Sequence, residues 1–179
     1  MRIPTATGLA CLMAGAGLLA PTPGAMAATT WGYSASSGAD CQLSIPTLDT
    51  KFRPKASGAR NESSKDTYFV ICPAQGFSSS IDTVTQIAAA FSYTPPPGVS
   101  GAIISCTAVS GTASAFNLRY STKTTFFPGG APISWTGDDF GGLSGSPIPN
   151  SLVLSVTCTL PPGTAIDFVE TISAYDIGQ

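Results

Sequence analysis

The stretch Asn150–Tyr175, NSLVLSVTCTLPPGTAIDFVETISAY, decides the fold class of this chain. From Leu152 to Leu160, large apolar side chains alternate mostly with Ser and Thr, which is the period of two expected of a half-buried strand. A Pro-Pro-Gly turn at 161–163 stops the run, because proline lacks the ladder donor and glycine tolerates turn angles. A second alternating run follows directly. Two such runs around a short turn predict an antiparallel hairpin.

The second run places Ile166, Phe168, Glu170 and Ile172 on one side of its strand. Strict alternation then sends Asp167 and Glu170 to opposite faces. A glycosidase needs two carboxylates about 5–9.5 Å apart across a cleft, so these two are a poor catalytic pair. Glu170 is interpreted as a hydrogen-bonded structural acid, since buried carboxylates need partners.

The first 27 residues have the pattern of an export signal: Arg2, an apolar stretch over Leu9–Ala20, and the small-x-small site Ala25–Ala27. We therefore expect residues 28–179 to form a single domain outside the cytoplasm, secreted or periplasmic. The apolar stretch is too short for a stable membrane span. An alternative is a lipid anchor at Cys11, although little apolar sequence precedes it.

Four cysteines follow the signal, and an even number in an exported chain predicts two disulfides. Three pairings are possible. We favour Cys41 with Cys72 and Cys106 with Cys158, because these pairs join successive parts of the chain without crossing. A four-thiolate metal site is the poorer alternative, because no CxxC pair is present, and we expect no metal and no cofactor.

The chain contains no histidine. That absence excludes Ser-His-Asp and Cys-His catalysis, as well as zinc held by histidine. Paired cysteines would also exclude a thiolate nucleophile. A carboxylate-dependent hydrolase remains as an alternative, and we expect a protein that is not an enzyme.

Other segments carry β-strand signals separated by Gly and Pro. Thr67–Cys72 has the strongest β propensity, and we expect it to be central and well buried. Ser80–Tyr93 fits helical and strand spacing, and we favour a strand paired with Ala102–Val109. The remaining expectations are an aromatic segment tied down at Ala28–Ala39, a strand at Cys41–Ile45, an edge strand at Phe116–Phe127, and a loop at Pro128–Pro149.

The segment Asp49–Asp66 is basic, apolar-poor and interrupted by Pro and Gly, so we interpret it as a loop. A solvated loop is one reading, and a contact for an anionic glycan or lipid headgroup is the other. Nucleic acid is a weaker candidate, because the whole chain has a formal net charge of −2. The candidate residues are Lys51, Arg53, Lys55 and Arg60.

The best candidate for ligand binding lies inside the loop Pro128–Pro149. Aromatic faces stack on sugar rings, and carboxylates bind sugar hydroxyls or calcium. The alternative is a turn with exposed acids and one anchoring Trp. Calcium is disfavoured, because two adjacent carboxylates lack the spaced ligands of a calcium loop. The candidate residues are Trp135, Asp138, Asp139 and Phe140.

The layout resembles a group of small uncharacterised exported bacterial proteins. The resemblance rests on an early cysteine, the phrases RNES at 60–63 and YFVICP at 68–73, a central cysteine, and the phrase CTLPPGTAI at 158–166 followed by Val169 and Glu170. It implies an extracellular β-domain with two disulfides, and it brings no activity or catalytic residue.

Together these observations predict an all-β protein with a single antiparallel β-sandwich, immunoglobulin-like or jelly-roll-like, stapled by two disulfides. We expect an extracellular or envelope-associated binding or structural role, with a glycan or a cell-envelope component as partner. The alternative is a subunit of a surface fibre or coat, formed by self-assembly through exposed strand edges.

Overall fold

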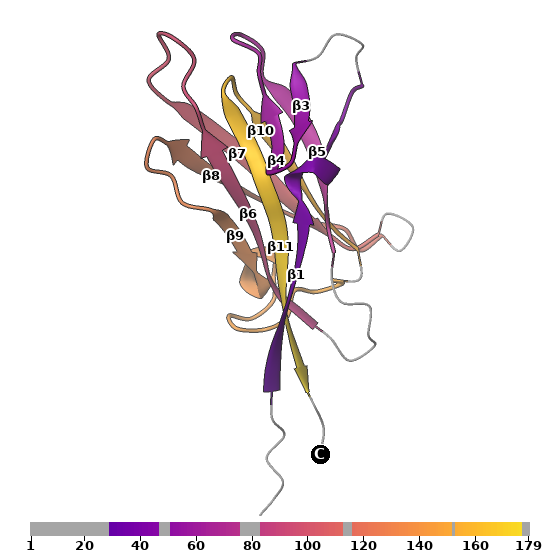
Figure 1. The fold of residues 1–179 in the computed structure, drawn as a ribbon. Helices are drawn as coiled ribbons and strands as arrows, with labels where there is room; N and C mark the ends of the chain where they lie inside the picture. The colour runs from indigo at the N-terminus through magenta and orange to yellow at the C-terminus, as the bar shows by residue number, and fades with distance from the viewer. Residues whose placement is uncertain (1–28, 47–50, 76–82, 113–115, 152, 177–179) are drawn as a thin grey trace, which may run out of the picture.

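A computed structural model describes residues 29–46, 51–75, 83–112, 116–151 and 153–176, and in these ranges the protein is all-β (Figure 1). A six-stranded sheet has the order β3-β4-β11-β6-β9, with β1 also paired to β11, and a five-stranded sheet has the order β2-β5-β10-β7-β8. We call them sheet A and sheet B. The strands are β1 (Thr29–Ser37), β2 (Gln42–Leu43), β3 (Phe52–Lys55), β4 (Gly58–Asn61), β5 (Tyr68–Ala74), β6 (Thr83–Tyr93), β7 (Ala102–Ser110), β8 (Arg119–Phe127), β9 (Ile133–Thr136), β10 (Leu154–Leu160) and β11 (Thr164–Asp176).

The two sheets share one hydrophobic core. It contains side chains such as Ile87 and Ile166 from sheet A and Val70 and Ile104 from sheet B, all at 0% exposure. Every strand pair is antiparallel. The predicted all-β class with two antiparallel sheets is therefore confirmed.

The predicted hairpin between β10 and β11 is wrong. β10 pairs with β5 and β7 in sheet B, whereas β11 pairs with β1, β4 and β6 in sheet A. The turn at 161–163 carries the chain from one sheet to the other. Gly163 has a φ of 79°, and a Cβ added there would lie 2.3 Å from the carbonyl oxygen of Thr94. The position therefore requires glycine.

A β-bulge in β11 changes which side chains face the core. The pairing with β6 shifts between Ile166 and Phe168, which leaves Asp167 as the extra residue. Beyond the bulge, Val169 is buried and Phe168 is 38% exposed. The expectation that Phe168 and Ile166 share a face is therefore wrong, because a bulge reverses the alternation.

The segment 83–93 is a strand, as favoured, but its predicted partner is wrong. β6 pairs with β11 and β9, and β7 pairs with β10 and β8 in the other sheet. β5 is not fully buried either, because Phe69 and Ile71 point outward with exposures of 55% and 44%. Its only neighbour on one side within the described chain is the two-residue strand β2.

Most of the described part of the predicted basic loop is a hairpin of β3 and β4. The register places Phe52 opposite Asn61 and Arg53 opposite Arg60. Phe52 and Ala59 are buried, which anchors the hairpin despite its low apolar content. Asn61 is 0% exposed, and its amide donates to the carbonyl oxygens of Asp66 at 2.7 Å and Leu160 at 2.8 Å. The loop interpretation missed these few buried anchors.

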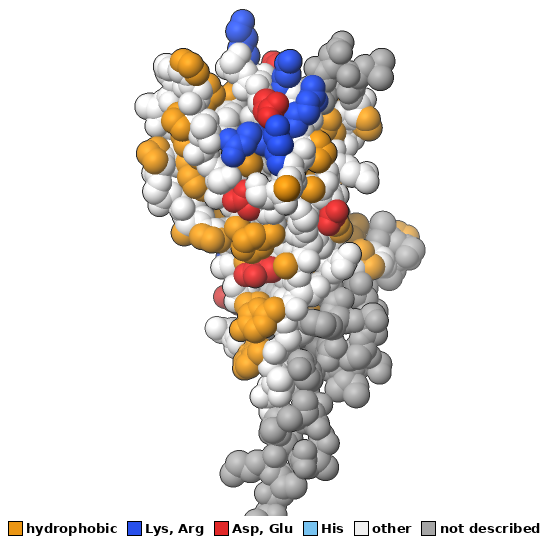
Figure 2. Space-filling model, in the orientation of Figure 1, with side chains coloured by type: hydrophobic (Ala, Val, Ile, Leu, Met, Phe, Trp, Pro, Cys, Tyr) orange, Lys and Arg blue, Asp and Glu red, His pale blue; other side chains and the backbone are white. Residues whose placement is uncertain are grey.

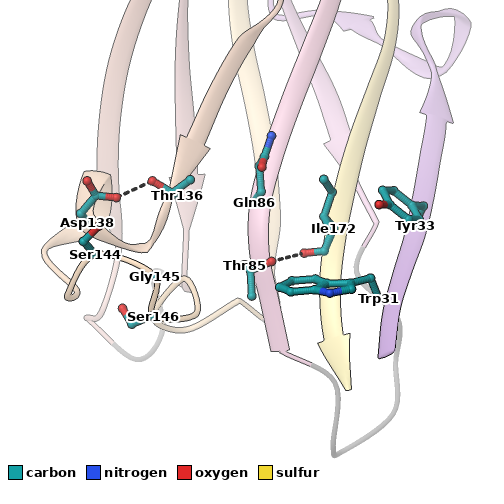
Figure 3. Close-up of a pocket in the computed structure, with 10 residues that line it drawn as sticks. All are labelled: Trp31, Tyr33, Thr85, Gln86, Thr136, Asp138, Ser144, Gly145, Ser146 and Ile172. Carbon is teal, nitrogen blue, oxygen red and sulfur yellow. Dashed lines mark hydrogen bonds between the residues drawn. The ribbon is translucent and has the colours of Figure 1, made fainter. Parts of the chain in front are cut away.

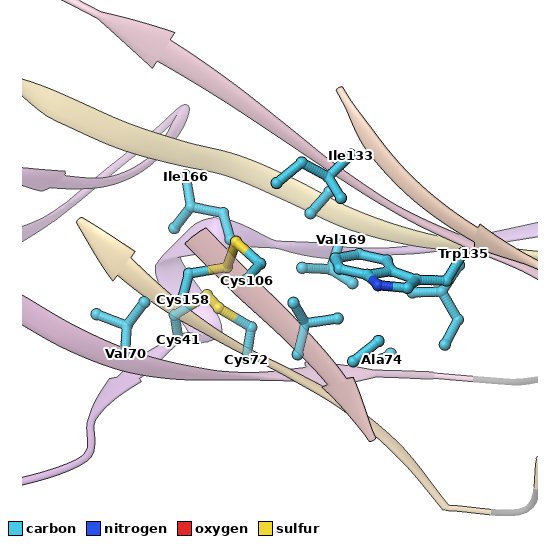
Figure 4. Packing of buried hydrophobic residues seen from close by; sticks show 14 of the residues in the cluster. Cys41, Val70, Cys72, Ala74, Cys106, Ile133, Trp135, Cys158, Ile166 and Val169 are labelled. Carbon is cyan, nitrogen blue, oxygen red and sulfur yellow. A yellow bond between two sulfur atoms is a disulfide. The ribbon is translucent and has the colours of Figure 1, made fainter. Parts of the chain in front are cut away.

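The favoured disulfide pairing is confirmed, with bonds between Cys41 and Cys72 and between Cys106 and Cys158. Cys106 and Cys158 are directly opposite each other on β7 and β10. Cys72 belongs to β5, and Cys41 immediately precedes β2, which pairs with β5. Figure 4 shows the two bonds side by side among the core residues. Both bonds therefore staple sheet B to itself, unlike the bond between sheets in an immunoglobulin domain.

The predicted export signal and the alternative anchor at Cys11 lie outside the described residues. Within the described ranges, no helix is long and apolar enough to cross a membrane.

Candidate functional site

A groove of about 460 Å³ crosses the outer face of sheet A near the end where β1 begins (Figure 3). Its floor is one cross-strand row: Tyr33 is opposite Ile172, Ile172 is opposite Gln86, and Gln86 is opposite Thr136. The row spans four strands, so four distant parts of the chain meet here. This volume is in the range usual for small-ligand sites, about 300–1,000 Å³.

Two aromatic side chains form one end of the groove. Trp31 is 54% exposed and Tyr33 is 66% exposed, although the sequence suggested that both would be tied down by burial. The reason is the alternation along β1: the small residues Gly32 and Ser36 are buried, so the large ones point outward. Full burial of a large apolar side chain is worth roughly 1.5–3 kcal/mol, and each of these two rings forgoes part of that energy. Exposed apolar surface beside polar groups is typical of a ligand site.

The opposite end of the groove is polar. It is formed by Thr136, by Asp138 of the 3-10 turn η3 (Gly137–Phe140), and by Ser144 and Ser146 of the following loop. The hydroxyl of Thr136 donates a hydrogen bond to Oδ1 of Asp138. That bond, followed by backbone amide hydrogen bonds, holds the pKa of Asp138 below its usual range. Asp138 is therefore an ionised acceptor at neutral pH.

A hydrogen bond from a side chain to the backbone helps to hold the floor between the two ends in place. The hydroxyl of Thr85 donates to the carbonyl oxygen of Ile172 at 3.1 Å, which ties β6 to β11 next to the ring of Trp31 (Figure 3). Gln86 adds a side-chain amide between the aromatic and acidic ends. The groove therefore offers, in order, two ring faces, an amide, hydroxyls and a carboxylate.

Two of the four residues predicted for ligand binding belong to the core instead. Trp135 is 0% exposed and Phe140 is 3% exposed. The indole Nε1 of Trp135 donates to the carbonyl oxygen of Ser121 at 3.0 Å, and Figure 4 shows its ring packed beyond Val169. The expectation that these two rings face a ligand is wrong, because their strand and turn point them between the sheets.

The two adjacent acids have different surroundings. Oδ2 of Asp139 forms an ion pair with Nζ of Lys123 at 2.7 Å and accepts the backbone N–H of Thr136 at 2.8 Å. Asp139 therefore fixes η3 against β8. Asp138 is the member of the pair that borders the groove.

The basic residues lie at the other end of the same face. Figure 2 shows blue side chains gathered over the hairpin of β3 and β4, with hydrophobic side chains lower on the face, toward β1 and β11. Lys55 forms an ion pair with Glu62 at 2.5 Å, and Nη1 of Arg60 donates to Thr94 Oγ1 at 2.7 Å. Lys51 and Arg53 complete this cationic face, and Lys51 borders a separate depression of about 390 Å³.

Sequence reasoning missed the aromatic end of the groove and its floor. One signal was present: in TTWGYSASS, both rings alternate with Gly and Ser, which indicates that the rings are not on the packed side. The assembly of the floor had no local signal, because its residues come from four strands.

The groove's chemistry follows from its lining. Asp138 is the one carboxylate among the described residues that border it, so the two facing carboxylates used by most glycosidases are not present there. The described ranges also hold no cluster of three or more His, Cys, Asp or Glu residues suited to a metal ion. The arrangement can stack a flat apolar face against rings and hydrogen-bond hydroxyls at the other end.

No protein-family model matches the chain, and no curated protein matches it.

Proposed function

We propose that the protein is a non-catalytic glycan-binding protein that acts outside the cytoplasm and holds a saccharide in the groove between β1 and η3. The single observation that carries the proposal is the pair of exposed rings, Trp31 and Tyr33, in one groove with the ionised Asp138. A sugar ring has an apolar face of C–H groups and a rim of hydroxyls. Each part has a counterpart in the groove.

Location outside the cytoplasm is proposed on the two disulfides together with the signal pattern of the sequence. Disulfides persist in oxidising compartments and are rare in the cytosol. Both bonds are buried in the core, where they serve stability rather than redox chemistry.

The cationic face of the hairpin supports a preference among glycans. Arg53 and Arg60 are directly opposite each other, and like charges in that arrangement repel. Glu62 and Asp167 offset part of this charge. The remaining positive field favours glycans that carry acidic groups, or an acidic component of a cell envelope.

A glycan array probed with the purified protein tests the proposal, followed by titration with each glycan that binds. Trp31 is the exposed member of the two tryptophans, so stacking there should change the intrinsic fluorescence. Trp31→Ala should weaken binding at least tenfold, about 1.4 kcal/mol, as expected of a central aromatic contact. The matched control is Phe69→Ala, which removes a ring of 55% exposure from the outer face of sheet B.

Binding to no glycan by the folded protein would contradict the proposal, as would equal losses for Trp31→Ala and Phe69→Ala. Repeating the array with Lys51→Gln and Arg53→Gln separates the charge preference from the groove. These changes should weaken the binding of acidic glycans and leave the binding of neutral glycans unchanged.

A further inference from the structure

The outer strands of a sheet expose unpaired backbone groups, and proteins usually guard them against pairing with other chains. β3 carries Arg53, Pro54 and Lys55, which are all effective guards. β2 is two residues long. The guards on these two edges are charge, proline and short length.

The edges β8 and β9 cover each other. Nζ of Lys123 on β8 donates to the carbonyl oxygen of Ser134 on β9 at 2.8 Å. The indole of Trp135 on β9 donates to the carbonyl oxygen of Ser121 on β8 at 3.0 Å. Side chains from each strand therefore occupy backbone acceptors of the other.

β1 has none of these guards. Its nine residues, TTWGYSASS, contain no charge and no proline. The pairing with β11 runs from Thr29–Asp176 to Ser37–Phe168 with no bulge, and no other described strand pairs with β1. In Figure 1, the lower parts of β1 and β11 extend together below the rest of the sheet. A long, regular, neutral edge is the kind that accepts another strand.

We propose that β1 is a self-association edge, on which β1 of a second copy pairs antiparallel about a twofold axis. Sheet A would then continue from one copy into the other. Twofold dimers are the commonest symmetric assemblies, and such an interface uses the same surface on both copies.

The absence of charged residues on β1 favours a second copy of the chain as the partner at its free edge. In a twofold pair, every residue of the strand meets a residue of the same strand, so charges on the edge face like charges. β3 would bring its Arg53 and Lys55 close to the same residues of the other copy, and directly opposed like charges destabilise a sheet. β1 brings none, because it carries no charge.

The side chains of the two β1 strands also fit together when the strands overlap along their whole length. The centre of the strand is Tyr33, so it meets the partner's Tyr33, and Trp31 meets the partner's Ala35. All three side chains are on the exposed outer side of β1. Two rings side by side are a favourable cross-strand pair, and Ala35 is small enough to leave room for the indole.

The two-copy arrangement deepens the glycan proposal without depending on it. Trp31 and Tyr33 form the end of the groove nearest to the free edge of β1. Pairing through β1 would bring the aromatic ends of two grooves together on one continuous sheet face. A polymeric glycan could then contact both copies.

Light scattering of the purified protein over a range of concentrations tests the proposal directly. We expect twice the mass of one chain, and Tyr33→Lys should return it to the mass of one chain by placing two ammonium groups opposite each other. Tyr33 is 66% exposed, so this change should leave the thermal unfolding transition in place. The control is Thr124→Lys, which adds the same charge to an exposed position of β8 and should leave the doubled mass unchanged.

A crosslink tests the register. Residues directly opposite in an antiparallel pair have Cα atoms about 4.5–5.5 Å apart, which is within the range of a disulfide. Tyr33→Cys should therefore give a band of doubled mass in non-reducing electrophoresis, and Thr124→Cys should remain single.

A one-chain mass at the highest concentrations would overturn the proposal. A doubled mass that persists in Tyr33→Lys would also overturn it. So would dissociation of Thr124→Lys to the same extent as Tyr33→Lys. Tyr33→Ala separates the two proposals, because it should remove glycan binding while backbone pairing keeps the doubled mass. Failure of the glycan array with a doubled mass intact would count against glycan binding alone.

Discussion

The two tryptophans of the chain allow a direct test of which ring stabilises the core and which ring is exposed without a role in stability. Trp135 is completely buried, and Trp31 is half exposed at one end of the groove. The perturbation is the same in both cases, Trp→Ala. The expected results differ, because only one of the two changes opens a cavity.

The magnitude for Trp135→Ala follows from its surroundings. Truncating a fully buried aromatic side chain costs about 3–5 kcal/mol. The change also removes the hydrogen bond from Nε1 to Ser121, which adds about 1 kcal/mol. A domain of this size has a free energy of unfolding of roughly 5–15 kcal/mol, so the variant would be near the limit of folding. Trp31→Ala opens no cavity and should stay within about 0.5 kcal/mol.

Urea unfolding followed by far-ultraviolet circular dichroism measures both variants without a tryptophan signal. The midpoint should fall sharply for Trp135→Ala and stay in place for Trp31→Ala, with an unchanged slope for the latter. Trp135→Phe, which keeps a ring, should lose less and provides a measurable variant if the alanine variant does not fold. Equal midpoints for the two alanine variants would refute the assignment of Trp135 to the core.

Removing the bond between Cys106 and Cys158 by a double change to alanine should cost about 4 kcal/mol for its sequence separation of 52, seen as a lower calorimetric melting temperature. A loss under about 1 kcal/mol would contradict that role. Gly163→Ala should destabilise by more than about 1 kcal/mol, because the added Cβ meets a backbone oxygen at 2.3 Å, whereas Gly98→Ala has a similar φ of 80° and open space. Equal unfolding midpoints for the two glycine variants would show that the clash is relieved elsewhere. Burial raises the pKa of Asp167, so its ionised form is disfavoured in the folded state and stability falls as the pH rises above the ordinary Asp value of about 3.9. Asp167→Asn should therefore be the more stable protein at pH 7 and lose that advantage below about pH 3.9, as measured by urea titrations at both pH values.

Local patterns predicted the strands and the disulfides. Alternation in a run such as Leu154–Leu160 indicates which side chains are buried. An even number of cysteines after a predicted export signal indicates disulfides. The favoured pairing was correct because Cys106 and Cys158 are on neighbouring strands of one sheet. These features depend on sequence alone or on simple order along the chain.

Strand partners could not be predicted in the same way. A Pro-Pro-Gly turn fits a hairpin and a crossing between sheets equally well, and here it is a crossing. The bulge at Asp167 is a second case, because one inserted residue reverses the alternation and no residue type marks it. Both features are set by packing between distant segments.

The sequence placed Trp135 in the candidate site, whereas the structure buries it completely, for a related reason. A Trp beside two acids suggested a ligand loop. However, Ile133 and Trp135 alternate with Ser134 and Thr136, which is the pattern of a strand with its large apolar side chains inward. Asp138, which was predicted to bind a ligand, is exposed and borders the groove, and its role in binding stays a prediction. The groove that it borders required the fold.

The position of the two disulfides determines how this domain would respond to a mechanical load. Thr29 and Asp176 are neighbours on the last rung of the ladder between β1 and β11. Tension applied between these two residues would break the hydrogen bonds between β1 and β11 one after another, rather than loading all of them in shear at once. Both sulfur–sulfur bonds are in the opposite sheet and would carry none of this tension. The domain would therefore yield first at β1, at low force, while sheet B stays locked.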